Sequence, residues 1–181
     1  MLQDLSLHIY DLAENGVSAG AKLIQIKVSE MPSTNQLTIV IEDNGKGMDE
    51  ATLKWAQSPF STERTARKVG LGIPFMKQAC LQGGGTFALQ SQPGKGTVLT
   101  ASFAYDHWDR QPLGEVFMTV FLLVGGHPQL DFYYQHRVEE KEWIFDTREI
   151  RKTLQDVPLD HPKVLEWIAD YLKENVELLY Q

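Results

Sequence analysis

EDNGKGMDE, residues 42–50, follows a run of alternating apolar and polar residues. That run, residues 37–42, has the period of two that is typical of a β-strand with one buried face. Asp43 stands at the end of the strand, and Gly45 and Gly47 stand in the turn. A carboxylate here can accept a hydrogen bond from an exocyclic amine, and glycines allow a flat ring to approach closely. A tight turn at Asn44 explains the same letters equally well, so this stretch alone leaves a surface turn and a nucleotide site open.

An amphipathic helix is predicted over roughly the first fifteen residues, stopping in the region of Gly20. Its polar side gathers four residues within a narrow arc: Asp11, Glu14, Asn15 and Ser18. A solvated helix face would look the same. Asp11 and Asn15 are four apart and project side by side, so an amide oxygen able to bind Mg²⁺ stands next to a carboxylate able to orient or deprotonate a nucleophile.

A phosphate site is suggested further along by VGLGIPF, residues 69–75. Gly70 and Gly72 begin a predicted helix directly after a basic loop, and the free N–H groups of a helix start attract phosphate. A flexible helix entry explains the glycines as well.

The predicted elements of residues 1–105 are a helix, two strands, a short helix, a loop, a helix and a hairpin. This order predicts an α+β fold, a two-layer sandwich of a mixed sheet with helices on one face. Residues 1–105 are expected to form one domain and residues 106–181 a small α+β extension. In the extension we expect a helix over 112–125, a hairpin over 130–145, a short helix over 147–154 and a last helix from about 160.

The whole arrangement resembles the GHKL superfamily, the ATP-binding fold of histidine kinases, DNA gyrase, MutL-type repair proteins and heat-shock chaperones. Four motifs occur in its order: DLAENGVSAGA (11–21), EDNGKGMD (42–49), SPFSTERTARKVGLGIPF (58–75) and GGGTFALQSQPGKGTVLTASF (83–103). The resemblance covers about residues 3–104 and implies ATP and Mg²⁺ as ligands.

The resemblance also implies a role for each matching residue. Asn15 would coordinate the Mg²⁺ that bridges the phosphates, and Asp43 would receive the adenine amino group. The base pocket would be shaped by Gly45 and Gly47, packed by Met48 and supported by Thr97. The phosphates would meet the backbone of Gly70, Leu71 and Gly72, with Arg67 and Lys68 in the lid.

Catalysis is left open by one departure from the family pattern. Hydrolysing members have a glutamate where this chain has Asp11, which is shorter by one methylene group. Asp11 is a candidate weak base, with Glu14 as the alternative. Since His8 stands in the same predicted helix as Asn15, we expect no phosphoacceptor histidine in this chain. The expected function is a stand-alone kinase or ATPase module that acts on or with a protein partner; the alternative is a non-catalytic, ATP-dependent switch or adaptor.

The net charge of −7 arises entirely beyond Tyr105, where 8 Lys and Arg face 15 Asp and Glu. This charge argues against a nucleic-acid partner and favours a protein with a basic patch, although a solvated acidic face explains it too. No segment has the apolar length for membrane insertion, and the first residues do not resemble a signal peptide, so a cytoplasmic protein is expected. Whether it forms a dimer stays open.

Overall fold

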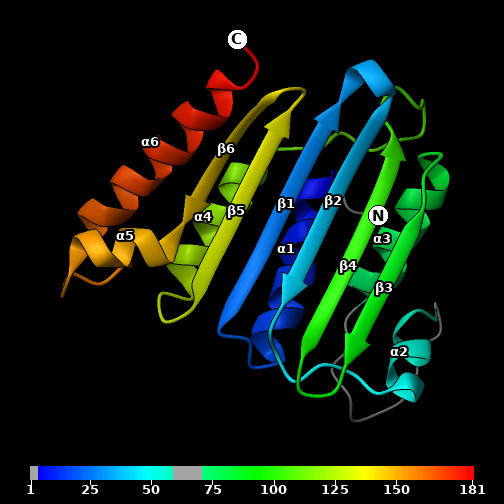
Figure 1. The fold of residues 1–181 in the computed structure, drawn as a ribbon, viewed down its shortest axis with the longest axis horizontal. Coiled ribbons are helices and arrows are strands. Elements are labelled where there is room, and N and C mark those ends of the chain that lie inside the picture. Colours follow the sequence, from blue (N-terminus) through cyan, green and yellow to red (C-terminus); the bar gives the residue numbers. More distant parts are fainter. Residues whose placement is uncertain (1–3, 59–70) are drawn as a thin grey trace.

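The computed structural model describes residues 4–58 and 71–181, which contain one mixed sheet of six strands. The strands lie in the order β3-β4-β2-β1-β5-β6, and all neighbours are antiparallel except β1 and β5, which run parallel. Their bounds are β1 (Leu23–Met31), β2 (Gln36–Asp43), β3 (Phe87–Gln92), β4 (Gly96–Ala104), β5 (Asp131–Val138) and β6 (Lys141–Asp146). A 3₁₀ turn, η1 (Pro32–Thr34), joins β1 to β2. Helices α1, α3 and α4 lie on one face of the sheet (Figure 1), so the α+β sandwich expected from the sequence is confirmed.

Two helices of the first 105 residues begin at an aspartate that caps them. Asp4 caps α1 (Leu5–Ser18) by accepting a hydrogen bond from the N–H of Leu7, and the positive φ of Gly20 ends the helical path. Asp49 caps α2 (Glu50–Ala56) in the same way. The helix α3 (Gly72–Gln82) follows the segment that is not described.

Beyond Tyr105 the chain continues the same sheet. It forms α4 (Val116–Gly126), the hairpin of β5 and β6, α5 (Thr147–Leu154) and α6 (Pro162–Leu178). The predicted start of α4 at Pro112 is wrong, because Gly114 has a φ of +75° that an α-helix cannot contain. The Pro112 carbonyl instead accepts a hydrogen bond from the N–H of Leu5, at 2.9 Å. Residues 106–181 therefore extend the sheet by pairing β5 along β1.

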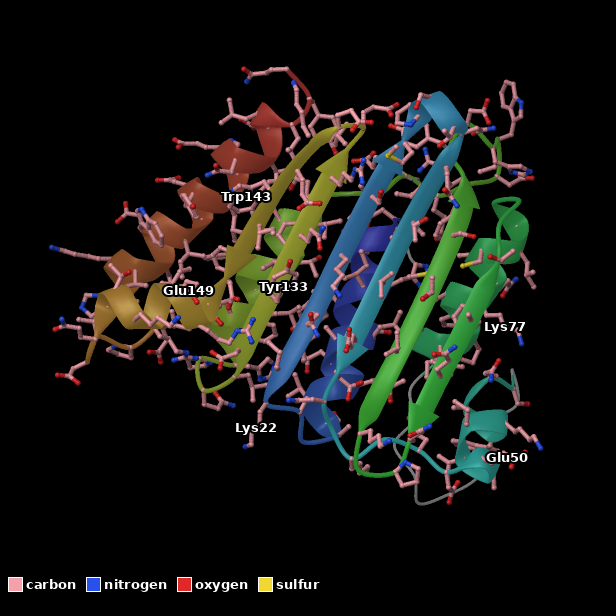
Figure 2. The ribbon with its side chains drawn as sticks, in the orientation of Figure 1. Lys22, Glu50, Lys77, Tyr133, Trp143 and Glu149 are labelled. Carbon is pink, nitrogen blue, oxygen red and sulfur yellow. The ribbon has the colours of Figure 1, made fainter. Side chains whose placement is uncertain are left out.

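The core lies between the sheet and the helices. Ile24, Ile26 and Val28 of β1 point into it, and the residues between them stay half-buried on the other face. Figure 2 shows Tyr133 of β5 on this open face, away from the helices. At the edge of the fold α6 packs on α4, with Leu165 beside Gly125. Among the described residues, no helix combines the length and apolar character that crossing a bilayer requires.

Candidate nucleotide-binding site

A cavity of about 710 Å³ lies where the end of β2 meets α1, the start of α3 and the β3–β4 hairpin. Five residues expected at a nucleotide site line it: Asn15, Asp43, Gly47, Met48 and Thr97. The remaining walls are largely apolar, with Leu12, Ile41 and Leu99 among them. Apolar walls with a few convergent polar groups are typical of a site for a ligand of nucleotide size.

Asp43 is the last residue of β2 and pairs with Thr97 of β4. Its Oδ1 accepts a hydrogen bond of 2.8 Å from the N–H of Gly45. Burial raises the pKa of Asp43 above its ordinary value of 3.8, against the opposing effect of hydrogen bonds from Gly45 and Thr97. Because an ionised carboxylate offers about four acceptor positions, Asp43 can also accept a hydrogen bond from a ligand in the cavity.

Asn15 projects from α1 with a buried amide. Its Nδ2 has no hydrogen-bond partner among residues 4–58 and 71–181, and it lies 3.6 Å from where a Cβ on Gly72 would be. The unpartnered N–H of this amide can donate to an acceptor on a ligand, such as a phosphate oxygen, and the amide oxygen is a ligand type that cations accept. One such oxygen suits Mg²⁺, which usually keeps several waters and takes other ligands from the substrate phosphates. The described residues contain no group of three His, Cys, Asp or Glu side chains that could bind a metal by themselves.

The two candidate bases lie differently from each other. Asp11 has an exposed side chain and does not line the cavity, although its Cβ is 3.4 Å from where a Cβ on Gly72 would be. Glu14 turns toward the C-terminal part of the chain, where its Oε1 lies 2.7 Å from Nε2 of His127. Both candidates come from the same helix, yet only Asp11 faces the start of α3.

The turn after β2 and the β3–β4 hairpin pack together through one glycine on each side. Gly47 has a φ of +64°, and a Cβ there would lie 1.9 Å from the carbonyl oxygen of Gln92. Gly96 has a φ of +94°, and its Cβ would lie 1.9 Å from the carbonyl oxygen of Asp43. Asn44 accepts hydrogen bonds from the N–H groups at the start of β1. Residues 43–48 therefore form a tight turn and also part of the cavity wall.

Ser91 is a polar residue of this region that the sequence reasoning missed. Its hydroxyl accepts a hydrogen bond of 2.8 Å from the N–H of Met48 and donates one of 2.8 Å to the carbonyl of Gly96. It also lies 3.0 Å from the hydroxyl of Thr97. The alternation of β3 places Ser91 on the same side as Leu89, a lining residue, which was the available signal.

The phosphate end is described in part. Leu71 precedes α3 without a side-chain cap, and Gly72 is its buried first residue. Arg67, Lys68 and Gly70 lie outside the described residues.

Residues 2–107 match the family described as histidine kinase-, DNA gyrase B- and HSP90-like ATPases. The chain belongs to this family. All residues that line the cavity fall within the matched range, and the resemblance seen in the motifs is confirmed. Residues 2–107 are an ATPase domain of the GHKL type, homologous to part of sensor histidine kinases.

Two relatives of this ATPase domain are sensor kinases. The tetrathionate sensor histidine kinase TtrS of Salmonella typhimurium is 34% identical over 100 residues, which are 53% of this chain and 16% of TtrS. The sensor protein kinase FleS of Pseudomonas aeruginosa is 35% identical over 92 residues, 51% of this chain and 23% of FleS. The chain thus spans less than a quarter of either kinase.

Two solved structures share the fold. The ATPase domain of MutL from Aquifex aeolicus, complexed with ADP, aligns with a TM-score of 0.52 at 11% identity, covering 86% of this chain and 70% of that one. The N-terminal domain of a DNA repair protein aligns with a TM-score of 0.51 at 15% identity, over 79% of this chain and 52% of that one.

Proposed function

We propose that the cavity binds Mg-ATP and that the chain acts as a kinase or ATPase module on or with a protein partner. The observation that carries this proposal is the meeting of Asp43 and Asn15 on one cavity inside the family-matched range. In this proposal residues 1–105 carry the nucleotide chemistry, and residues 106–181 form an extension that serves the partner.

The adenine end of the proposed site is Asp43. Its carboxylate would accept a hydrogen bond from the adenine amino group, with Thr97 holding that carboxylate in place. The side chain of Met48 would pack near the base, and Gly45 and Gly47 would shape this end. Support comes from the hydrogen bonds that orient Asp43 and from the cavity position of Met48.

The phosphate end would be formed by Asn15 and the start of α3. When bound, Mg²⁺ would supply positive charge that offsets the negative charge of the phosphates during phosphoryl transfer. Asn15 would hold this ion through its amide oxygen, while its buried, unpartnered Nδ2 would donate a hydrogen bond to a phosphate oxygen. The N–H groups of Leu71 and Gly72 would bind phosphate oxygens at the positive end of the α3 dipole. Gly70, Arg67 and Lys68 would complete this end and the lid.

His8 is not placed to serve as the phosphoacceptor of this site. His8 lies seven residues before Asn15 on α1, about 10 Å along the helix axis. It is 1% exposed, and its Nε2 lies 3.0 Å from Oε1 of Gln111. A buried histidine fixed in the helix that carries Asn15 cannot reach the γ-phosphate of its own site.

A second candidate function is a non-catalytic switch that senses ATP. The observation that favours it is the position of the two candidate bases: Asp11 is exposed off the cavity and Glu14 pairs with His127. Nucleotide would then stabilise one conformation without being consumed.

Calorimetry with Mg-ATP tests the site. Asp43→Asn and Asn15→Ala are each expected to abolish or strongly weaken binding. Glu42→Gln is the matched control, because Glu42 precedes Asp43 on β2 with its side chain half-exposed and 3.6 Å from Lys27. Undiminished affinity in both site variants would refute the proposal.

A second assay separates the two functions. Protein incubated with γ-labelled ATP and candidate partners is expected to release phosphate or label a partner if it is an enzyme. ATP binding without either product would establish the switch instead.

A further inference from the structure

The outer surface of α6 carries an aromatic stripe, formed by Trp167 and Tyr171, beside a row of carboxylates. Helix α6 forms the edge of the molecule beyond β6, with one side against α4 and the other turned outward (Figure 1). At 100° per residue, the exposed Trp167, Glu174 and Leu178 and the half-buried Tyr171 fall within an arc of about 60°. Trp167 is 47% exposed and Leu178 54%.

The aromatic stripe is held rigidly from the core outward. Trp143 lies on β6 beside α6 (Figure 2), with its ring 6.2 Å from that of Tyr134 and 5.5 Å from that of Tyr171. Tyr171 stacks on Trp167 with 4.8 Å between centroids and an interplanar angle of 15°. Since these contacts fix the indole before any partner arrives, binding to it would cost little side-chain entropy.

The row of carboxylates adjoins this stripe. Glu166, Asp170 and Glu174 are exposed, and within the part of the chain that the structure describes they form no ion pair; the pairing on this helix joins Lys173 to Glu177 at 4.0 Å. The helix carries four acidic and two basic residues, within an extension that holds the entire net charge of −7. Such a surface attracts cations and repels nucleic acid and anionic lipid.

Arginine is the side chain that matches both features. Its guanidinium is planar and weakly hydrated, so it stacks on an indole face while it donates hydrogen bonds to carboxylates. Lysine satisfies the charge but stacks less well. Trp, Tyr and Arg are also the residues that dominate protein interfaces.

We propose that the outer face of α6 binds an arginine-bearing segment of a partner protein, with Trp167 as the stacking platform and Glu166, Asp170 and Glu174 as the carboxylates that pair with it. None of these residues lines the nucleotide cavity, because all of its lining residues fall between Leu12 and Leu99 in the sequence. The docking surface therefore stands independently of the proposed ATP chemistry, and its test needs no nucleotide.

The test is calorimetric titration of the full chain with octa-arginine and with octa-lysine. We expect tighter binding of octa-arginine. Trp167→Ala should weaken it about tenfold, as for a central interface residue, and should abolish the preference over octa-lysine. Trp167→Phe, which keeps a ring, should fall between. Glu166→Gln, Asp170→Asn and Glu174→Gln combined should weaken binding of both peptides.

Two controls match these variants. Trp108→Ala removes a tryptophan that is 99% exposed elsewhere. Asp109→Asn, Glu115→Gln and Asp156→Asn remove the same charge from exposed positions outside α6. Equal binding of the two peptides by the unmodified chain, or equal losses in control and α6 variants, would overturn the inference. So would binding to vesicles of anionic lipid in place of the peptide.

Discussion

Replacing Glu30 with alanine is expected to lower the free energy of unfolding more than any other single carboxylate change in the sheet. Glu30 lies on β1, is 5% exposed and accepts three hydrogen bonds from distant segments. His136 of β5 donates at 2.9 Å, Tyr105 after β4 donates at 3.3 Å, and Tyr180 after α6 donates to the same oxygen as His136.

The expected magnitude follows from this burial. Removing one member of a buried, hydrogen-bonded charged group costs about 3–5 kcal/mol, because its partners are left unsatisfied. For a chain of 181 residues, an unfolding entropy of about 2.1 cal/mol/K per residue converts this cost into a fall of about 8–13 °C in Tm. Tyr180→Phe, which removes one hydrogen bond to a charged acceptor, should cost about 1.5–3 kcal/mol.

Urea unfolding monitored by circular dichroism measures the free-energy cost of Glu30→Ala and of Tyr180→Phe. Glu42→Ala is the control, because its half-exposed pair with Lys27 should be worth less than about 1 kcal/mol. A cost for Glu30→Ala no greater than that of Glu42→Ala would refute the reasoning.

The same network predicts a pH dependence. Burial acts to raise the pKa of Glu30, but the hydrogen bonds from His136 and Tyr180 outweigh it, and the pKa lies below its ordinary value of 4.5. A carboxyl group with a lowered pKa contributes stability above its ordinary pKa and loses it as pH falls through the folded-state value. The stability difference between the unmodified chain and Glu30→Gln should therefore shrink below about pH 4.5. A difference that stays constant into acid would contradict this.

Further predictions concern the nucleotide site. Asp43→Asn should weaken ATP binding about 10- to 100-fold, which is the cost of losing a hydrogen bond to a charged group. The Tm should not fall, because burial disfavours the ionised form of Asp43. A lower Tm would point to a structural role for Asp43. Since the pKa of Asp43 is raised, ATP affinity in the unmodified chain should fall with acidification as the carboxyl group loses its acceptor role. The fall should be smaller in Asp43→Asn, where only the ATP phosphates titrate, as calorimetry across pH would show. Gly47→Ala should lower both Tm and ATP affinity, whereas Gly94→Ala, which has a similar φ of +74° but open space, should cost only backbone strain, about 1 kcal/mol; equal costs would exclude the contact with Gln92. Asp11→Glu should raise phosphate release if Asp11 is a weak base, and an unchanged rate would remove it from the mechanism.

Much of the nucleotide site was accessible from local patterns. Asn15 and Asp43 were identified because motif order and strand periodicity are local properties of the chain, and the structure brings both to one cavity. Their roles stay predictions. The pairing of Glu14 with His127 could not be foreseen, since it joins residues 113 apart. Ser91 was missed because a single serine in a strand carries no motif.

The sequence by itself determined the helices, the strands and the order of the four motifs, since each depends on apolar periodicity and on capping or turn residues within a few positions. In the structure, Glu30 lies on the buried face of β1, two residues after Val28. Only the tertiary structure decided how residues 106–181 join the fold. The parallel pairing of β5 with β1 and the meeting of Glu30 with Tyr180, 150 residues later, arise from chain closure, which leaves no signal in local spacing.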